Sequence, residues 1–182
     1  MPISFDLNIG SSPVLCELNH ILNPRPQLTA SWTFNRYFRD QETFLLRSEA
    51  GKPTIAPATW GLSGDGDCRS YTDDRDPVLA RRGVIFATAY YMKVPQQDRP
   101  WLDNSFRVKP WGWFAVGVSW AETLAGDEFA VLTTSAGPDA APKLRHMPVI
   151  VPVTVIGTWL DPNYQGGLNL PKLTWLAQVE RV

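Results

Sequence analysis

The stretch FAVLTTSAGPDAAPKLRHMPVIVP, residues 129–152, decides how this sequence is interpreted. It opens with the apolar run 129–134 and closes with a second one, 147–151, and the segment between them is rich in Ala, Pro and Gly. Apolar and β-branched runs bounded by turn residues are typical of strands, so the pattern predicts two strands separated by a loop. The same criteria, applied outward, predict strands over residues 43–47, 83–94, 113–120 and 173–182.

Helix signals are few. Ser12 is a suitable N-cap and Pro13 fits the first helical position, and the apolar residues that follow recur at helical spacing as far as Asn23. Two shorter helices are predicted, one opening at Asp76 and the other over residues 154–160. The Gly- and Asp-rich residues 63–76 are predicted to form a long loop. These signals together predict a β-rich domain with short helices.

Composition bounds the class of protein. The chain has 182 residues, about one domain, and it is 44% hydrophobic and only 19% charged, which excludes a disordered chain. Its formal net charge is −1, so it lacks the strongly basic character of many nucleic-acid-binding proteins. Two cysteines and two histidines, far apart in the sequence, predict neither a disulfide scaffold nor a metal site, and no cofactor is expected. With no apolar run long enough for a membrane span and no signal peptide, we expect a cytoplasmic protein without a membrane partner.

Charge is nevertheless segregated along the chain. Residues 81–120 contain six basic and two acidic side chains, a balance of +4, whereas residues 121–140 contain four acidic side chains and no basic one, a balance of −4. A local basic groove is one reading of this pattern. Solvated strand faces are the other.

Residues 129–152 resemble the C-terminal motif of the SOS-response-associated peptidase family, in which a strand ending in Thr-Thr leads through a turn to a His-x-Arg-Met-Pro-Val-Ile segment. Further segments match that family in the same order along the chain. They are MPISF at residues 1–5, TWGLS at 59–63, RRGVIFATAYYMKV at 81–94, FAVGVSWAE at 114–122 and TWLDP at 158–162.

The resemblance implies a single domain over residues 1–182, of the α+β class, with a strongly bent, barrel-like antiparallel β-sheet and a few short helices. The family recognises single-stranded DNA that carries an abasic site, held in a basic cleft. A cysteine at position 2, exposed by removal of Met1, condenses with the sugar aldehyde through its amine and its thiol and forms a thiazolidine crosslink. An Asn, a Glu and a His support the proton transfers.

The positions that carry this chemistry are mostly different here. Pro2 stands at the cysteine position, and Met92 stands where the glutamate is expected. The loop that should supply the asparagine is unrecognisable, and the residues nearest to it are Arg69, Ser70 and Tyr71. The sequence therefore predicts a catalytically degenerate relative that forms no thiazolidine.

Two residues keep an altered chemistry open. Leu144 occupies the family's histidine position, but His146 lies on the same face of a strand two residues later and could act as an acid or base. Pro2 would become a secondary amine on removal of Met1, and such an amine can attack an aldehyde to give an iminium. A structural or phosphate-facing role is the alternative for His146.

Several residues are candidates for contact with single-stranded DNA. Trp60 could stack on a base or simply pack against a neighbouring strand. Thr133 and Thr134 end a strand, where their hydroxyls could meet DNA or satisfy loop backbone groups. The basic candidates are Arg81, Arg82, Lys93, Arg107 and Lys109.

Three functions follow from these observations. The first is a degenerate family member that keeps a single-stranded-DNA cleft. The second is a phage- or prophage-type module that binds a protein partner, for which exposed Trp101, Trp111 or Trp113 would supply an apolar patch. The third is an enzyme with altered chemistry through Pro2 or His146.

Overall fold

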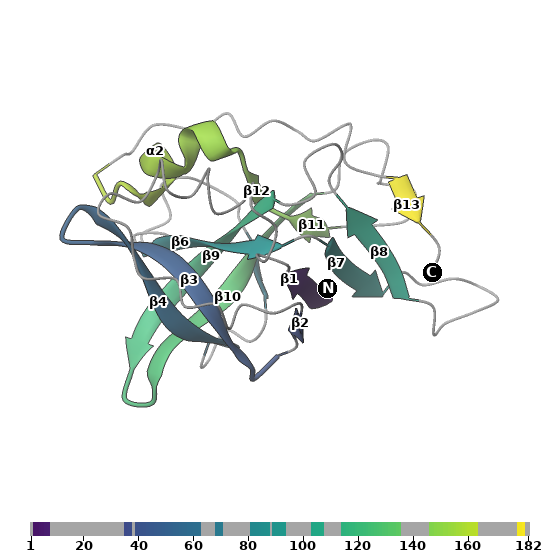
Figure 1. The fold of residues 1–182 in the computed structure, drawn as a ribbon, viewed down its shortest axis with the longest axis horizontal. Coiled ribbons are helices and arrows are strands. Elements are labelled where there is room, and N and C mark those ends of the chain that lie inside the picture. Colours follow the sequence, from purple (N-terminus) through teal and green to yellow (C-terminus); the bar gives the residue numbers. More distant parts are fainter. Residues whose placement is uncertain are drawn as a thin grey trace.

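The computed structural model of the chain describes residues 2–7, 35–37, 39–62, 68–70, 81–87, 89–93, 103–107, 114–135, 146–163 and 178–180 (Figure 1). Two β-sheets and one short helical segment account for most of these residues. Side chains are described for residues 39–62, 81–87, 114–135 and 146–163.

Five long strands of the larger sheet form a ring. Their bounds are β3 (Glu42–Glu49), β4 (Lys52–Trp60), β6 (Arg82–Ala87), β9 (Phe114–Thr123) and β10 (Gly126–Ser135). The antiparallel pairings run from β4 through β3, β6 and β9 to β10. β10 then returns to β4, which it meets in parallel at Phe129 and Trp60. This return of the pairing to β4 is what bends the sheet so strongly.

The segment β11 (His146–Pro148) and β12 (Ile150–Val151) fills the place where β9 and β10 separate. The β9–β10 pairing extends from the hairpin turn only to Val118 and Val131; beyond it β11 pairs with β10 and β12 pairs with β9. Val149 joins the two strands, because its N–H donates to the Leu132 carbonyl at 2.8 Å and its carbonyl accepts from the Gly117 N–H at 2.8 Å. The Met-Pro-Val-Ile segment thus keeps the open end of the hairpin hydrogen-bonded.

Most of the inner face of the ring is apolar. Cross-strand pairing and the two-residue alternation of strands place one set of side chains on this face, all of them at most 2% exposed. Trp60 and Phe129 stack there with ring centroids 6.4 Å apart and planes inclined by 11°. The other members of the set are Leu45, Ile85, Val118 and Val131.

A short helix covers the outer face. After η2 (Val153–Val155), α2 (Ile156–Leu160) buries Ile156, Trp159 and Leu160. The Trp159 indole N–H donates to the Gly83 carbonyl at 2.9 Å. Its ring lies against Gly117, where a Cβ would come within 2.8 Å of Trp159 Cζ2. Glycine at position 117 is therefore the residue that lets this helix approach the sheet.

The smaller sheet has the strand order β13–β8–β7–β1–β2 and is antiparallel throughout. β1 contacts β6 of the ring, which brings the start of the chain against the larger sheet. The strands are β1 (Pro2–Leu7), β2 (Asn35–Tyr37), β7 (Ala89–Lys93), β8 (Asp103–Arg107) and β13 (Gln178–Glu180).

The expected α+β class with a strongly bent, mainly antiparallel sheet is confirmed, and the predicted helix over residues 154–160 is present as η2 and α2. Two expectations are wrong in detail. The region predicted as a loop contains β5 (Cys68–Ser70), which pairs in parallel with β10. The run 83–94 is two strands, β6 and β7, which belong to different sheets. The predicted helices starting at Ser12 and Asp76 lie outside the described residues.

Replacing Gly117 with Ala is expected to lower the free energy of unfolding by roughly 1–3 kcal/mol, because the new methyl group overlaps the Trp159 ring. Gly157→Ala is the matched control: Gly157 lies on the exposed side of α2, and no atom lies within 4 Å of the point that its Cβ would occupy, so the change should be neutral or slightly stabilising. Urea unfolding of both variants measures the difference. Equal stabilities would contradict the close approach of α2.

Candidate functional site

Pro2 and Met92 are direct partners in the smaller sheet. β1 and β7 run antiparallel, and Pro2 is paired with Met92 and Ser4 with Tyr91, with an irregularity between the two pairs. Residues directly opposite in an antiparallel pair have Cα atoms about 4.5–5.5 Å apart. The two positions that the family resemblance assigns to the nucleophile and to the glutamate therefore lie side by side.

These two residues cannot perform the family's chemistry. Proline carries no thiol, and the methionine thioether neither donates nor accepts a proton at ordinary pH. A reactive group that this arrangement could offer is the secondary amine of Pro2 once Met1 is removed. That amine can form an iminium with an aldehyde but cannot close a thiazolidine ring.

Trp60 is a core residue. It is 1% exposed and stacks on Phe129 inside the ring. Its backbone is fixed as well, since its N–H donates to the Gln41 carbonyl at 3.1 Å and its carbonyl accepts from the Asp40 N–H at 2.8 Å. The expected base-stacking role does not agree with this burial; packing against a neighbouring strand does.

Three other candidates meet at the junction of β10, β11 and β5. Thr133 is 8% exposed and pairs with Pro148 on one side and with Ser70 of β5 on the other. Thr134 is half-buried opposite Met147. His146 is exposed and pairs with Ser135 at the start of β11. The structure thus places Ser70, from the segment expected to be a loop, beside Thr133.

Arg81 and Arg82 lie at the end of β6 that is farther from β7, so they do not join Lys93 on β7. Arg82 is 7% exposed, donates to the Asp161 carbonyl at 3.1 Å and lies 5.3 Å from the Trp159 ring. Arg81 is half-exposed and pairs with Glu122 at 4.0 Å. Both arginines are therefore engaged by residues of β9 and of the segment around α2.

The remaining candidates are placed only in part. In the β7–β8 register the backbone of Lys93 lies opposite that of Asp103, and Arg107 ends β8 opposite Gln178. Lys109, Leu144 and Tyr71 lie outside the described residues. So do the tryptophans proposed for an apolar patch, Trp101, Trp111 and Trp113.

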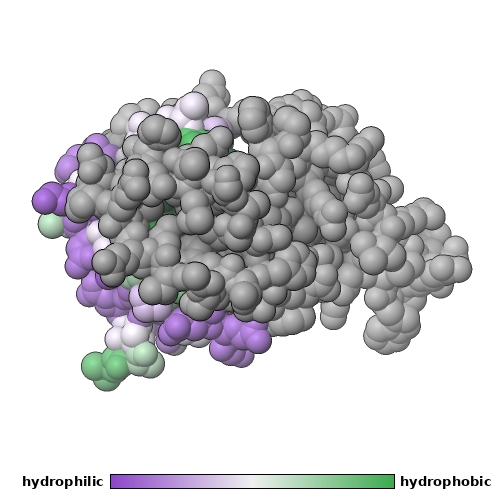
Figure 2. Space-filling model, viewed as in Figure 1, coloured by the Kyte–Doolittle hydropathy of each residue, from purple (hydrophilic) through white to green (hydrophobic). Residues whose placement is uncertain are grey.

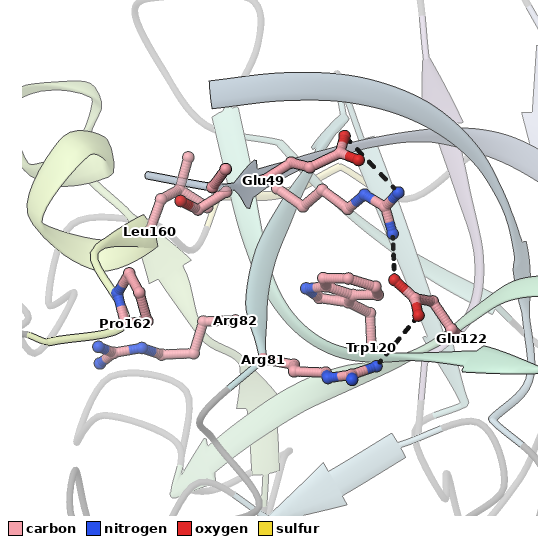
Figure 3. Close-up of a pocket in the computed structure, with 10 residues that line it drawn as sticks. Glu49, Arg81, Arg82, Trp120, Glu122, Leu160 and Pro162 are labelled. Carbon is pink, nitrogen blue, oxygen red and sulfur yellow. Dashed lines mark ion pairs between the residues drawn. The ribbon is translucent and has the colours of Figure 1, made fainter. Parts of the chain in front are cut away.

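One end of the ring is closed by a charged cluster that the sequence did not predict. Arg47, on the inner face of β3, is 9% exposed, and its Nη1 lies 2.8 Å from Asp127 Oδ2 and 3.8 Å from Glu122 Oε1. Its guanidinium carbon stands 4.2 Å from the centroid of Trp120, and that of Arg81 stands 5.3 Å from the same ring. Figure 3 shows Arg81 and Glu122 converging beside Trp120. We call these residues the Arg47 cluster.

A pocket of about 270 Å³ opens beside the Arg47 cluster. The guanidiniums of Arg47, Arg81 and Arg82 are offset by the carboxylates of Glu49, Glu122 and Asp127, so the balanced charges give an anion little net attraction. The chemistry that this arrangement supports best is compensation of a buried cation. The pocket is lined by Arg47, Ser48, Glu49, Ala50, Arg81, Arg82, Trp120, Glu122, Leu160 and Pro162.

A sequence signal for Arg47 did exist. It stands at an alternating position of an otherwise apolar strand, FLLR, where a lone charge inside a buried run requires a partner. Glu49 lies two residues away on the same strand, but Glu122 and Asp127 come from β9 and β10, about 75 to 80 residues later in the sequence, and nothing local identifies those two.

The described residues contain no group of three or more His, Cys, Asp or Glu side chains arranged to hold a metal ion. Among them, no helix combines the length and the apolar character needed to cross a membrane.

No protein-family model matches this sequence, and no curated protein matches it. Solved structures do. A protein from Bordetella bronchiseptica has a TM-score of 0.63 at 16% identity, with 87% of each chain covered. A protein from Bacteroides thetaiotaomicron has a TM-score of 0.60 at 12% identity, covering 87% of this chain and 82% of the other.

A phage-related protein from Bordetella bronchiseptica has a TM-score of 0.61 at 16% identity, covering 90% of this chain and 82% of that protein. At such identities the likeness concerns the fold alone. The chain therefore has, over most of its length, a fold that also occurs in a phage-related protein.

Proposed function

We propose that this protein is a degenerate relative of the SOS-response-associated peptidase family that binds single-stranded DNA without crosslinking it. The observation that carries the proposal is the pairing of Pro2 with Met92. A centre built on residue 2 and an acid–base residue needs those two positions adjacent, and this sheet provides that adjacency. The residues that occupy them lack the thiol and the carboxylate.

The first test is covalent capture. We expect the wild-type chain to give no heat-stable adduct with abasic single-stranded DNA, whereas Pro2→Cys should give one, because its amine and thiol can both attack the aldehyde. Adding Met92→Glu should raise the rate by about 100-fold, since a carboxylate opposite residue 2 can move protons. A denaturing gel measures the adduct, on protein whose mass shows that Met1 has been removed.

Ser4→Cys is the matched control for that experiment. It places a thiol in the same strand, opposite Tyr91, but away from the terminal amine, so it should give no heat-stable adduct. Failure of Pro2→Cys to react would contradict the proposal that residues 2 and 92 mark the position of the family's reactive centre. A wild-type adduct that requires borohydride trapping and disappears in Pro2→Ala would instead support an enzyme that acts through an iminium.

Noncovalent binding should be weak, because the net charge of −1 supplies no long-range attraction. It should be strongly salt-dependent, because contacts to phosphates would supply most of it. We expect each phosphate contact to contribute about −0.7 to the slope of log affinity against log salt, and Arg107→Glu to reduce that slope. Arg39→Glu is the control, since Arg39 is exposed, pairs with Asp40 at 3.5 Å and lies outside the smaller sheet. Anisotropy titrations of labelled single-stranded DNA at two salt concentrations measure both. No binding at low salt would overturn the DNA proposal.

A module that binds a protein partner is the second candidate. It is supported by the fold shared with a phage-related protein and by Leu124, which is fully exposed at the β9–β10 turn. Figure 2 shows this hydrophobic tip projecting from a largely hydrophilic end of the molecule. Loss of DNA binding at every salt concentration, with the fold intact, would favour this candidate.

A further inference from the structure

Within the part of the chain that the structure describes, the outer edge of β4 is unpaired over most of its length. β3 pairs with β4 from Lys52 to Thr59, whereas β10 meets the other edge only at Thr59 and Trp60. Among the described strands, no other pairs with that edge. Lys52, Pro53 and Pro57 are exposed there. Such an edge is a template for a strand from another chain.

The turn before β4 determines which backbone groups point outward. Ala50 and Gly51 have φ values of 49° and 78°, as in a two-residue type I′ hairpin, which closes on a hydrogen-bonded pair, here Glu49 and Lys52. Every second residue after Lys52 then also bonds to β3, and the Trp60 N–H donating to the Gln41 carbonyl agrees with this register. The groups that point to the free edge therefore belong to the residues between them, Pro53, Ile55 and Pro57.

Both prolines thus stand where proline costs β3 no hydrogen bond and removes a donor from the free edge. They are also placed symmetrically about Ile55. In an antiparallel pair of two β4 edges centred on Ile55, residue 53 of each chain lies opposite residue 57 of the other. Each of those outer pairs would lose both of its hydrogen bonds, and only the central pair would keep its own.

We propose that the outer edge of β4 can pair with the same edge of a second copy of this chain, and that Pro53 and Pro57 weaken this pairing by removing donors from the edge. This inference is independent of DNA binding. Charge does not oppose it, since the residues between Pro53 and Ala58 are uncharged. The splayed arrangement of the β3–β4 and β9–β10 hairpins at the left of Figure 1 leaves the turn end of β4 away from β10.

The test restores the backbone N–H donors that Pro53 and Pro57 remove from the outer edge of β4. The double variant Pro53→Val, Pro57→Val is expected to form a dimer, with a dissociation constant at least tenfold below that of the wild-type chain. Adding Ile55→Pro removes the two bonds of the central pair without touching the β3 pairing, so this triple variant should dimerise more weakly than the double one. Light scattering across a concentration series, with circular dichroism as a check on the fold, measures the change.

A folded double variant whose mass equals that of the wild-type chain would overturn the proposal. So would a triple variant that dimerises as strongly as the double one, because the association would then not depend on edge hydrogen bonds. If the double variant does not fold, Pro53→Ala alone restores one donor in each outer pair. It should show a smaller shift toward dimer, and an unchanged mass in that variant overturns the proposal equally.

Discussion

Arg47→Met is expected to lower the free energy of unfolding by about 3–5 kcal/mol, the usual effect of breaking a buried ion pair from one side. Asp127 has a side chain only 13% exposed and would lose a cation at 2.8 Å, while Glu122 and Glu49 remain nearby with their like charge. The contact of the guanidinium with Trp120 disappears as well. Urea unfolding, with the midpoint and slope compared to the wild-type chain, measures the loss.

Two further variants separate the effect of burial from the effect of charge on the free energy of unfolding. Arg39→Met removes an arginine whose side chain is 59% exposed and whose pair with Asp40 is a surface one, so stability should change by less than about 1 kcal/mol. Arg47→Met combined with Asp127→Leu removes both buried charges and should recover most of the loss. A loss below about 1 kcal/mol for Arg47→Met would contradict the buried-cation account.

Trp159→Ala is expected to be as damaging, again by about 3–5 kcal/mol, because it opens a cavity between α2 and the ring. Trp159 is 0% exposed, and its indole N–H is the donor to the Gly83 carbonyl. Trp159→Phe keeps most of the volume and loses that donor, so it should cost less than the alanine variant. Thermal or urea unfolding of both variants tests the order.

The same contact predicts coupling with Gly117. In the Trp159→Ala background the extra methyl of Gly117→Ala meets no indole, so the second substitution should cost much less than it does alone. Additive losses of unfolding free energy would show that a methyl group at position 117 does not overlap the Trp159 ring.

The sequence by itself predicted most of the strands of the ring, because alternating and apolar runs bounded by turn residues are local signals. It also predicted the short helix over residues 154–160. These properties depend on which residues are present and on their spacing along a few turns or strands of chain.

Only the tertiary structure determined which side chains are buried and which are exposed. Alternation separates the two faces of a strand, but it does not say which face the rest of the chain will cover, so the pattern alone could not show that Trp60 belongs to the interior. The loop prediction for residues 63–76 is wrong at Cys68–Ser70 for a similar reason, since β5 exists through its pairing with β10 and not through its own composition.

The Arg47 cluster and the separation of Arg82 from Lys93 were likewise tertiary outcomes. A buried arginine is stable only where distant carboxylates meet it, and the return of β10 to β4 brings Asp127 to that place. Chain neighbours such as β6 and β7 can enter different sheets, so basic residues close in sequence need not share a surface. Burial and charge compensation are sums over nonlocal contacts, and only the folded chain determines them.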